Sequence, residues 1–500
     1  MHLSGLILSI DEGTTGISVL VLDQDAGVRG RAYSEFGQSY PRPGWVEHDP
    51  EEIWSVTASL VGSALRDAGA RPPDLTGIGI TNQRETTVLW ERASGRPVAP
   101  AIVWQCRRSA AICERLRAEG LEGELRKRTG LVLDPYFSAS KILWYLENID
   151  GVREQAEAGE LAFGTIDSWL IWKLTGGTRH VTEPTNASRT LLYSLREGRW
   201  DPWILEALDV PASLLPEVLP TSGTFGTTAP GLLDGAEVPV CGVAGDQQAA
   251  LFGQACFEPG MAKNTYGTGS FVLINTGGRV PESSHGLLST AAWDIGSGLQ
   301  YALEGSIFVT GAAIQWLRDG LEIISSSAEA GPLAESVPDT EGTYLVPAFT
   351  GLGAPHWDPY ARGAYVGITR GTTRAHLTRA AVEAMAYQTR DVVDAMTADA
   401  GVGLEELRVD GGASVMDFLC QFQADQLGVP VRRPAMAETT ALGAGYLAGL
   451  GAGMWSSLDE ISQRWSAEAE FEPAASRDEA DSAYEGWRKA VERSLDWAER

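Results

Sequence analysis

A segment near the N-terminus, Leu6–Asp23, constrains the fold of this chain more than any other. Two apolar, β-branched runs flank the turn Asp-Glu-Gly-Thr-Thr-Gly, and this order predicts a strand, a tight turn and a second strand. Gly13 and Gly16 allow the backbone to bring amide groups close to an anion, and Asp11 puts a carboxylate at the mouth of the turn. The turn therefore either binds a phosphate beside a hydrated Mg²⁺ or is an ordinary polar hairpin.

A second segment, Ala262–Asn275, has the same predicted order of strand, Gly-Thr turn and strand. Its sequence TYGTGSFVLIN corresponds to DEGTTGISVLVL of the first segment, in a repeat that is faint in identity but consistent in position. A Pro259-Gly260 turn separates two halves of similar size. We therefore predict two homologous domains, residues 1–258 and 259–500, each presenting one Gly/Thr hairpin to a phosphate chain in a cleft between them.

Composition and charge narrow the class of protein. The chain has 500 residues, 44% of them hydrophobic and 21% charged, which is typical of a globular protein with two or more domains. A formal net charge of −27 argues against a nucleic-acid or anionic-membrane partner, because either would need a basic face. No apolar run approaches the roughly 18 residues of a membrane span, and the five cysteines form no CxxC pair. We expect a soluble cytoplasmic protein with reduced thiols.

Polar side chains follow two further predicted strands. The strand at 77–81 is followed by Asn-Gln-Arg-Glu at 82–85, and the apolar run that begins at Val238 is followed by Gly-Asp-Gln-Gln at 245–248. Ligands of α/β sheets bind at such carboxyl ends of strands. The segment 82–85 is therefore either part of a ligand site or a solvated loop with an Arg–Glu pair. Trp104 likewise belongs either to the core or to the flat wall of a pocket.

The remaining pattern predicts alternating helices and strands. Gly411 and Gly412 follow a short strand and open a predicted helix that runs to Leu427, where amides and the helix dipole suit a nucleotide phosphate or ribose. Small residues dominate a predicted helix at 439–449, which is suited to close helix packing. The acidic tail after Trp465 is predicted to be helical. Further helices are expected at 46–70, 138–149, 160–175, 307–317 and 377–398, and a further strand at 344–350.

These motifs, in this order, resemble the FGGY family of carbohydrate kinases. The resemblance extends from Leu6 to about Trp455 and rests on IDEGTTG, PGWVEHDP, GITNQRETTVLW, YFSASKILWYLEN, TNASRTLL, GDQQAALFGQ, NTYGTGSF, GAAIQWLRD, PAFTGLGAPHWDPYARG, AYQTRDV and DGGA. It implies an α/β fold of two actin-like (ribonuclease-H-like) ATPase domains with a cleft between them. It also implies ATP as phosphoryl donor, Mg²⁺ as cofactor, and a homodimer or homotetramer.

The resemblance implies roles for individual residues. The QRE stretch and Trp104 resemble the corresponding residues of those family members that phosphorylate glycerol to sn-glycerol 3-phosphate. Asp246 would be the general base for the attacking hydroxyl. The three hydroxyls of glycerol would be bound by Arg84, Glu85, Tyr136, Asp246 and Gln247, with Trp104 and Phe271 along its carbon chain. The nucleotide phosphates would be held by Thr14, Thr15, Gly16 and Thr268. The ADP part would contact Gly311, Gln315, Gly412 and the position of Met416, and Mg²⁺ would lie near Asp11 and Asp246.

Two departures from the family pattern lie on the nucleotide side. The family usually has DQGTTSSR, so Ser18 stands where an arginine normally faces the phosphates, and Met416 replaces an asparagine near the nucleotide. A missing cation reduces stabilisation of the transferred phosphoryl group. These departures predict glycerol specificity with a weakened or altered nucleotide site.

A loop at residues 222–237 differs from those of regulated relatives. Some relatives bind fructose 1,6-bisphosphate there and others are phosphorylated on a histidine, but this loop has no Arg, Lys or His. We expect neither control. Two alternatives to a glycerol kinase remain: a kinase for another polyol or sugar, such as a pentulose, and an actin-like nucleotide-binding protein that has lost turnover.

Overall fold

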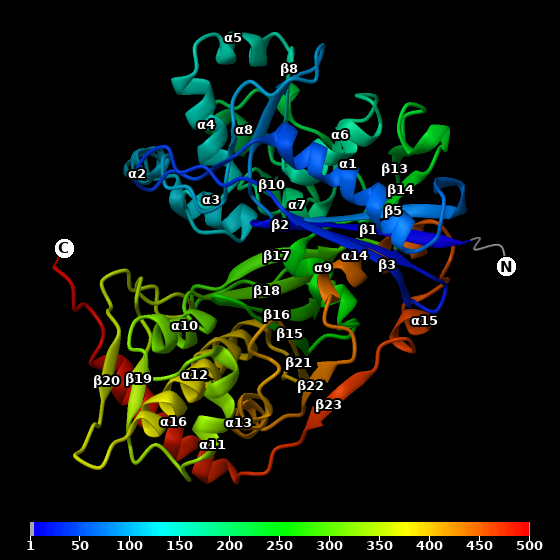
Figure 1. Cartoon of the computed structure of the whole chain (residues 1–500). Coiled ribbons are helices and arrows are strands. Elements are labelled where there is room, and N and C mark those ends of the chain that lie inside the picture. The colour runs from blue at the N-terminus through cyan, green and yellow to red at the C-terminus, as the bar shows by residue number, and fades with distance from the viewer. Residues whose placement is uncertain (1–4, 500) are drawn as a thin grey trace.

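The computed structural model describes residues 5–499, and each half of the chain contains one large mixed sheet (Figure 1). The strand order of the first sheet is β13–β14–β5–β1–β2–β3. In it β1, β2 and β3 form an antiparallel meander, and β5 and β14 continue the sheet parallel to β1. The strands are β1 (Leu6–Glu12), β2 (Gly16–Leu22), β3 (Val28–Glu35), β5 (Leu75–Asn82), β13 (Ser222–Thr227) and β14 (Pro239–Gly245).

The second sheet, with order β17–β18–β16–β15–β21–β22–β23, repeats this arrangement. β15 and β16 form an antiparallel hairpin like β1 and β2, and β21 lies parallel to β15 as β5 lies parallel to β1. The faint sequence repeat is thus a repeat of backbone topology. The strands are β15 (Met261–Tyr266), β16 (Ser270–Gly277), β17 (Leu288–Trp293), β18 (Gln300–Ile307), β21 (Glu406–Asp410), β22 (Val431–Pro434) and β23 (Ala467–Phe471).

Helices lie on both sides of the two sheets (Figure 1). On the outer face of the first sheet lie α1 (Pro50–Asp67) and α6 (Ile166–Leu174), and on the outer face of the second lie α12 (Arg374–Ala400) and α13 (Asp417–Leu427). Between the sheets lie α9 (Asp246–Gly253) and α14 (Thr439–Gly451), whose apolar side chains share one core with strands of both halves. In the chain α14 comes after β22 of the second sheet, but it packs against the first sheet.

Smaller elements complete the fold. A helical cluster beside the first sheet has its own apolar core and is formed mainly by α2 (Ala110–Ala118), α3 (Glu122–Thr129), α4 (Ser138–Asn148), α5 (Val152–Glu157) and α8 (Pro202–Ala207). The remaining helices are α7 (Pro184–Ala187), α10 (Gly311–Asp319), α11 (Ala330–Glu335), α15 (Leu458–Ser462) and α16 (Arg477–Glu492). Two-stranded pairs are β4 (Glu47–His48) with β7 (Ala101–Ile102), β6 (Val88–Glu91) with β8 (Leu161–Gly164), β9 (Val181–Thr182) with β12 (Glu217–Val218), β10 (Tyr193–Ser194) with β11 (Arg199–Trp200), and β19 (Tyr344–Val346) with β20 (Ala364–Val366).

The structure differs from the expected elements at several ends. The helix expected at 160–175 begins at Ile166, because residues 161–164 pair with β6 as strand β8. The helix expected from Ile307 begins at Gly311, and the strand from Tyr344 ends before Pro347. The acidic tail is not all helical: Ala-Glu-Ala-Glu-Phe alternates with a period of two and forms the edge strand β23 before α16.

Small residues bring α14 into backbone contact with α9, as the sequence predicts. A Cβ atom on Gly443 would lie 1.8 Å from the carbonyl oxygen of Ala249, and one on Gly253 would lie 2.0 Å from that of Thr439. Both approaches are far shorter than any non-bonded contact of a real Cβ atom, so only glycine fits at either position.

We expect Gly443→Ala to lower the free energy of unfolding by about 1–3 kcal/mol, because the added methyl group forces α9 and α14 apart. The shift of the urea unfolding midpoint measures this effect. Gly123→Ala is the matched control, since Gly123 is also helical but has open space around its missing side chain. Equal midpoints for the two variants would contradict the close helix contact.

The helices and the cysteines of the structure agree with what the composition predicts. Among residues 5–499 no helix has both the length and the apolarity that crossing a bilayer requires. All five cysteines are free and buried.

Candidate active site

The polar residues predicted at two strand ends meet at one edge of the first sheet. Arg84 and Glu85 follow β5, and Asp246 and Gln247 open α9 directly after β14. Because β5 and β14 are parallel neighbours, their carboxyl ends lie side by side, and Arg84 Nε lies 3.1 Å from Asp246 Oδ1. The backbone N–H of Gln247 donates to the same Oδ1 at 2.7 Å. The segment 82–85 is therefore no solvated loop; all four of its residues are buried.

Arg84 and Glu85 belong to a buried network of four charges that joins the two halves of the chain. Arg84 Nη1 lies 2.5 Å from Glu304 Oε2, and Arg189 Nη2 lies 2.8 Å from Glu304 Oε1. Arg189 Nε also lies 2.7 Å from Glu85 Oε1. Burial alone would raise the pKa of Glu304, but the charges of Arg189 and Arg84 bring it down to about 2. Glu304 comes from β18, so the second sheet fixes the orientation of Arg84.

Two members of this network, Arg189 and Glu304, are absent from the residues predicted as a site. Glu304 interrupts the buried apolar strand β18, and a lone carboxylate in such a strand is a signal that it has a buried partner. Arg189 lies within the TNASRTLL motif but carried no assigned role. Glu85 adopts a left-handed backbone conformation with φ of 61°, which is uncommon for a residue with a side chain and typical of functional loops.

Aromatic side chains line the same region. Trp104 is half-buried, its Nε1–H donates to Thr14 Oγ1 at 2.9 Å, and its ring contacts that of Tyr136 edge-on at 5.5 Å between centroids. Trp104 thus connects the polar residues at the edge of the first sheet to the β1–β2 turn. This position fits the predicted wall of a pocket. Phe271 is half-buried on β16 of the second sheet, and no ring contact joins it to either aromatic among the described residues.

Two carboxylates, those of Asp11 and Glu12, lie at the end of β1. Burial and the negative charge of Asp246 raise the pKa of Asp11 to about 7. Glu12 is buried, which raises its pKa well above the ordinary value; its Oε1 accepts from Gln83 Nε2 at 2.9 Å, and its Oε2 has no hydrogen-bond partner. Ser18 on β2 lies directly opposite Asp11 in the hairpin. Within residues 5–499, neither Asp11 nor Glu12 has an ion-pair partner, so this position lacks positive charge.

The predicted phosphate turn is a tight hairpin. The Gly13 N–H donates to the Gly16 carbonyl at 3.0 Å, and a Cβ atom on Gly16 would lie 2.6 Å from Tyr33 Oη. Thr14 is half-buried and Thr15 is exposed. The turn thus holds its two threonines at the end of β1, beside Asp11.

The corresponding turn of the second half, which contains Thr268, packs against two of the predicted nucleotide segments. A Cβ atom on Gly311, the first residue of α10, would lie 2.5 Å from the Gly267 carbonyl oxygen. One on Gly411 would lie 2.4 Å from the Tyr266 carbonyl oxygen. The hairpin, the start of α10 and the turn after β21 therefore converge. Gln315 is exposed one turn further along α10.

One part of the nucleotide prediction is wrong. The helix after β21 begins at Asp417, not at Gly412, and Met416 is its N-cap residue. Residues 412–415 form turns, which keep the start of the helix away from Gly412. Gly412 has no atom within 4 Å of its missing Cβ and lies beside open space.

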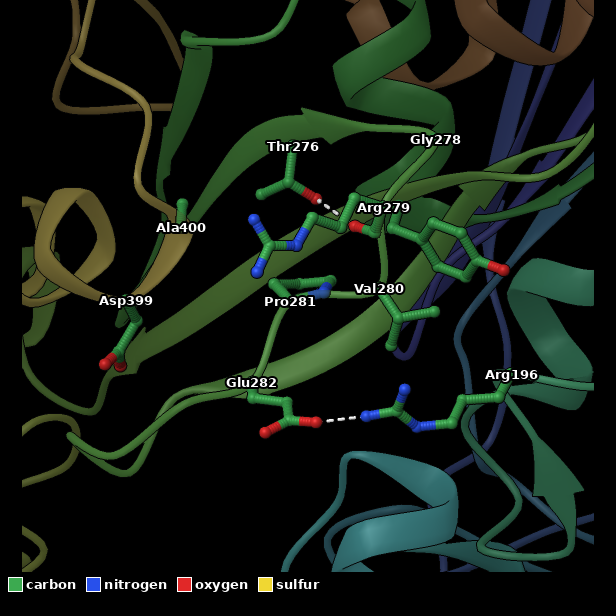
Figure 2. Close-up of a pocket in the computed structure, with 10 residues that line it drawn as sticks. Arg196, Thr276, Gly278, Arg279, Val280, Pro281, Glu282, Asp399 and Ala400 are labelled. Atoms are coloured by element: carbon green, nitrogen blue, oxygen red, sulfur yellow. Dashed lines mark hydrogen bonds and ion pairs between the residues drawn. The ribbon is translucent and has the colours of Figure 1, made fainter.

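A cavity of about 610 Å³ lies elsewhere, and none of the predicted site residues lines it (Figure 2). Arg196 and Glu282 form an ion pair at its edge, and Asp399 lies on its other side. It is therefore separate from the residues gathered around Arg84 and Asp246.

Comparison with known proteins decides the family. Residues 6–253 match the N-terminal domain of the FGGY family of carbohydrate kinases, and residues 262–452 match its C-terminal domain. The chain belongs to the FGGY family. The predicted family and the fold of two actin-like domains are confirmed. The predicted division between residues 258 and 259 falls between the two matched ranges and stays a prediction.

Relatives of this FGGY kinase share nearly its full length. A glycerol kinase of Carboxydothermus hydrogenoformans is 56% identical over 98% of both chains, and one of Halorhodospira halophila is 58% identical over 98% of this chain and 97% of the relative. The crystal structure of Plasmodium falciparum glycerol kinase with ADP superposes with a TM-score of 0.93 at 36% identity, covering 98% of each chain. A xylulose kinase of Lactobacillus acidophilus, at 20% identity and a TM-score of 0.88, shares the fold.

Proposed function

We propose that this FGGY kinase transfers the γ-phosphoryl group of ATP to glycerol, giving sn-glycerol 3-phosphate and ADP. The observation that carries the proposal is the contact of Arg84 with Asp246 at one sheet edge, beside Gln247 and the aromatic wall. A small triol offers hydroxyls that donate and accept, and this edge presents both kinds of partner. The glycerol kinases at 56% and 58% identity support the same substrate.

We infer that Asp246 is the general base. As the hydroxyl oxygen bonds to the γ-phosphorus, the bond from phosphorus to the bridging oxygen of ADP breaks and the hydroxyl proton moves to Asp246. The guanidinium of Arg84 and the N–H of Gln247 both contact Oδ1 of this carboxylate and orient it. Glycerol would also contact Glu85, Tyr136, Trp104 and Phe271, and the phosphates would lie between the turns that carry Thr14, Thr15, Gly16 and Thr268. The ADP part would reach Gly311, Gln315, Gly412 and Met416.

The residues present fit Mg²⁺. Asp11 and Asp246 would hold it, and the raised pKa of Asp11 and the unpaired Oε2 of Glu12 reflect negative charge without a cation. The described residues contain no group of three or more His, Cys, Asp or Glu side chains that could hold a metal, so phosphate oxygens and water would complete its coordination. Bound there, Mg²⁺ supplies positive charge that offsets the charge of the phosphates.

Ser18→Arg is expected to raise kcat or lower the KM for ATP several-fold, because a cation would then stand opposite Asp11 at the phosphate turn. Steady-state kinetics with ATP varied at saturating glycerol measures this. Ser18→Lys adds a positive charge but not the planar guanidinium group that can bind phosphate through two hydrogen bonds, so its kinetic effect should be smaller. Unchanged kinetics in the arginine variant would mean that the native site already compensates for the missing charge.

Fructose 1,6-bisphosphate is expected to leave the rate unchanged at millimolar concentration. The loop at 222–237 carries no cation of its own, and the neighbouring Arg179 donates to the Phe225 carbonyl within it at 3.1 Å. A phosphorylation assay with and without the bisphosphate measures the effect. Inhibition of the purified protein would show that the sugar phosphate binds by other residues.

A coupled assay across several substrates tests the proposed function. The expected result is ATP-dependent phosphorylation with the highest kcat/KM for glycerol among glycerol, erythritol, xylulose and dihydroxyacetone, with the product identified as sn-glycerol 3-phosphate. Preference for another substrate would favour a kinase for that polyol or sugar, and turnover of none would favour the regulatory alternative. A cytoplasmic homodimer or homotetramer is also proposed, and light scattering of the purified protein tests the oligomeric state.

A further inference from the structure

A lysine is buried in the second sheet without a carboxylate partner. Lys263 on β15 is 0% exposed, and its Nζ donates to Gln247 Oε1 and, at 2.9 Å, to Thr265 Oγ1. Among the described residues no carboxylate lies within ion-pair distance of it. The negative charges of Asp410, Asp246 and Glu304 favour the ammonium from a distance, but burial outweighs them and lowers the pKa of Lys263 to about 8, so a charge at this position is costly. The charge at this position therefore needs an explanation beyond packing.

The contact with Lys263 fixes which end of the Gln247 carboxamide faces the strand. An ammonium group can only donate hydrogen bonds, so the amide atom beside it must be the oxygen. The Nε2 end then points away from Lys263, and it has no partner within residues 5–499. Gln247 is half-buried, which leaves this NH₂ group accessible beside the Asp246 carboxylate.

We propose that Lys263 is a positioning residue that holds the Gln247 carboxamide with its NH₂ group toward the polyol. This inference rests on the proposed function, because it takes Gln247 to bind the substrate. One hydroxyl then accepts from Gln247 while its neighbour donates to Asp246, the base. Donor and acceptor thus stand next to each other in a fixed order, which selects the hydroxyl that loses its proton. Without Lys263 the carboxamide can turn over, and its oxygen then competes with Asp246 for hydroxyl protons.

Kinetics of Lys263→Met tests this role. We expect the KM for glycerol to rise about tenfold while the KM for ATP changes less than twofold, because the nucleotide side is untouched. Lys263→Arg should recover most of the glycerol affinity, since a guanidinium also only donates. The double variant Lys263→Met with Gln247→Ala should be no worse than Gln247→Ala alone, because Lys263 acts through Gln247.

A second variant leaves Lys263 in place, in case its replacement prevents folding. In Gln247→Glu one carboxylate oxygen would pair with Lys263 and the other would face the polyol as an acceptor, so the KM for glycerol should again rise at least tenfold. Native KM in this variant would overturn the inference. An equal rise of both KM values in Lys263→Met, or additive effects in the double variant, would also overturn it.

The experiments distinguish a failure of the proposed function from a failure of the positioning role of Lys263. A Gln247→Ala variant with native KM for glycerol would remove Gln247 from the polyol site and overturn both proposals. A raised KM in Gln247→Ala with native KM in Lys263→Met would overturn the positioning role alone and leave the proposed function intact.

Discussion

Asp246→Asn is expected to lower kcat by about 10²–10⁴-fold while glycerol and ATP still bind. The amide cannot take the proton of the attacking hydroxyl, and general-base catalysis typically contributes that factor. Binding should survive because Arg84 keeps its contacts with Glu304. Steady-state kinetics gives kcat, and calorimetric titration of the variant gives the two affinities.

Asp209→Asn is the control for this substitution, because Asp209 is an exposed carboxylate that pairs with Arg153 in a surface contact. It should keep native kcat. If Asp246→Asn retained more than a tenth of the native kcat, Asp246 would not be the base, and proton removal would have to be assigned to another group or to water.

Glu304→Gln is expected to lower the free energy of unfolding by about 3–5 kcal/mol, because removing one partner of a buried ion pair leaves uncompensated charge. In this variant the guanidinium groups of Arg84 and Arg189 would lose their shared counter-ion. The KM for glycerol should rise as well, since Arg84 would lose the contact that fixes its orientation. Denaturant unfolding and steady-state kinetics measure the two effects.

Glu282→Gln is the matched control, since Glu282 also pairs with an arginine, Arg196, but on the surface. Exposed pairs contribute little to stability, so its unfolding midpoint should stay near the native value. Equal shifts for Glu304→Gln and Glu282→Gln would mean that the buried network does not hold the two halves of the chain together.

The sequence predicts those parts of the fold that depend on residues close to one another in the chain. The strand–turn–strand segments at 6–23 and 262–275 form hairpins as expected, because short glycine-containing turns between two strand-forming segments leave few alternatives. The small residues of 439–449 predicted close helix packing, and α14 meets α9 through backbone contacts. The strand ends at 82–85 and 245–248 meet because parallel neighbouring strands end at the same edge.

The remaining features depend on contacts between distant residues. The pairing of Glu304 with Arg84 and Arg189 joins strands and loops of different halves, and periodicity carries no information about such partners. The sequence predicts too early a start for α13, because nothing local separates the Gly-Gly-Ala-Ser segment from the helix that follows it. The acidity of segment 467–471 favours a helix in the prediction and obscures the period of two that β23 follows. The sequence does not reveal that Lys263 is buried, because polar Asn264 and Thr265 follow it in the same strand.

A crystal structure with glycerol and a non-hydrolysable ATP analogue bound tests most directly whether phosphoryl transfer occurs at the Arg84–Asp246 edge. The expected result is one glycerol hydroxyl within about 3 Å of the Asp246 carboxylate, a second beside Gln247, and the γ-phosphate facing the first hydroxyl from the turn that carries Thr14. Glycerol bound at another place, such as the cavity of Figure 2, or bound with no hydroxyl near Asp246, would contradict it.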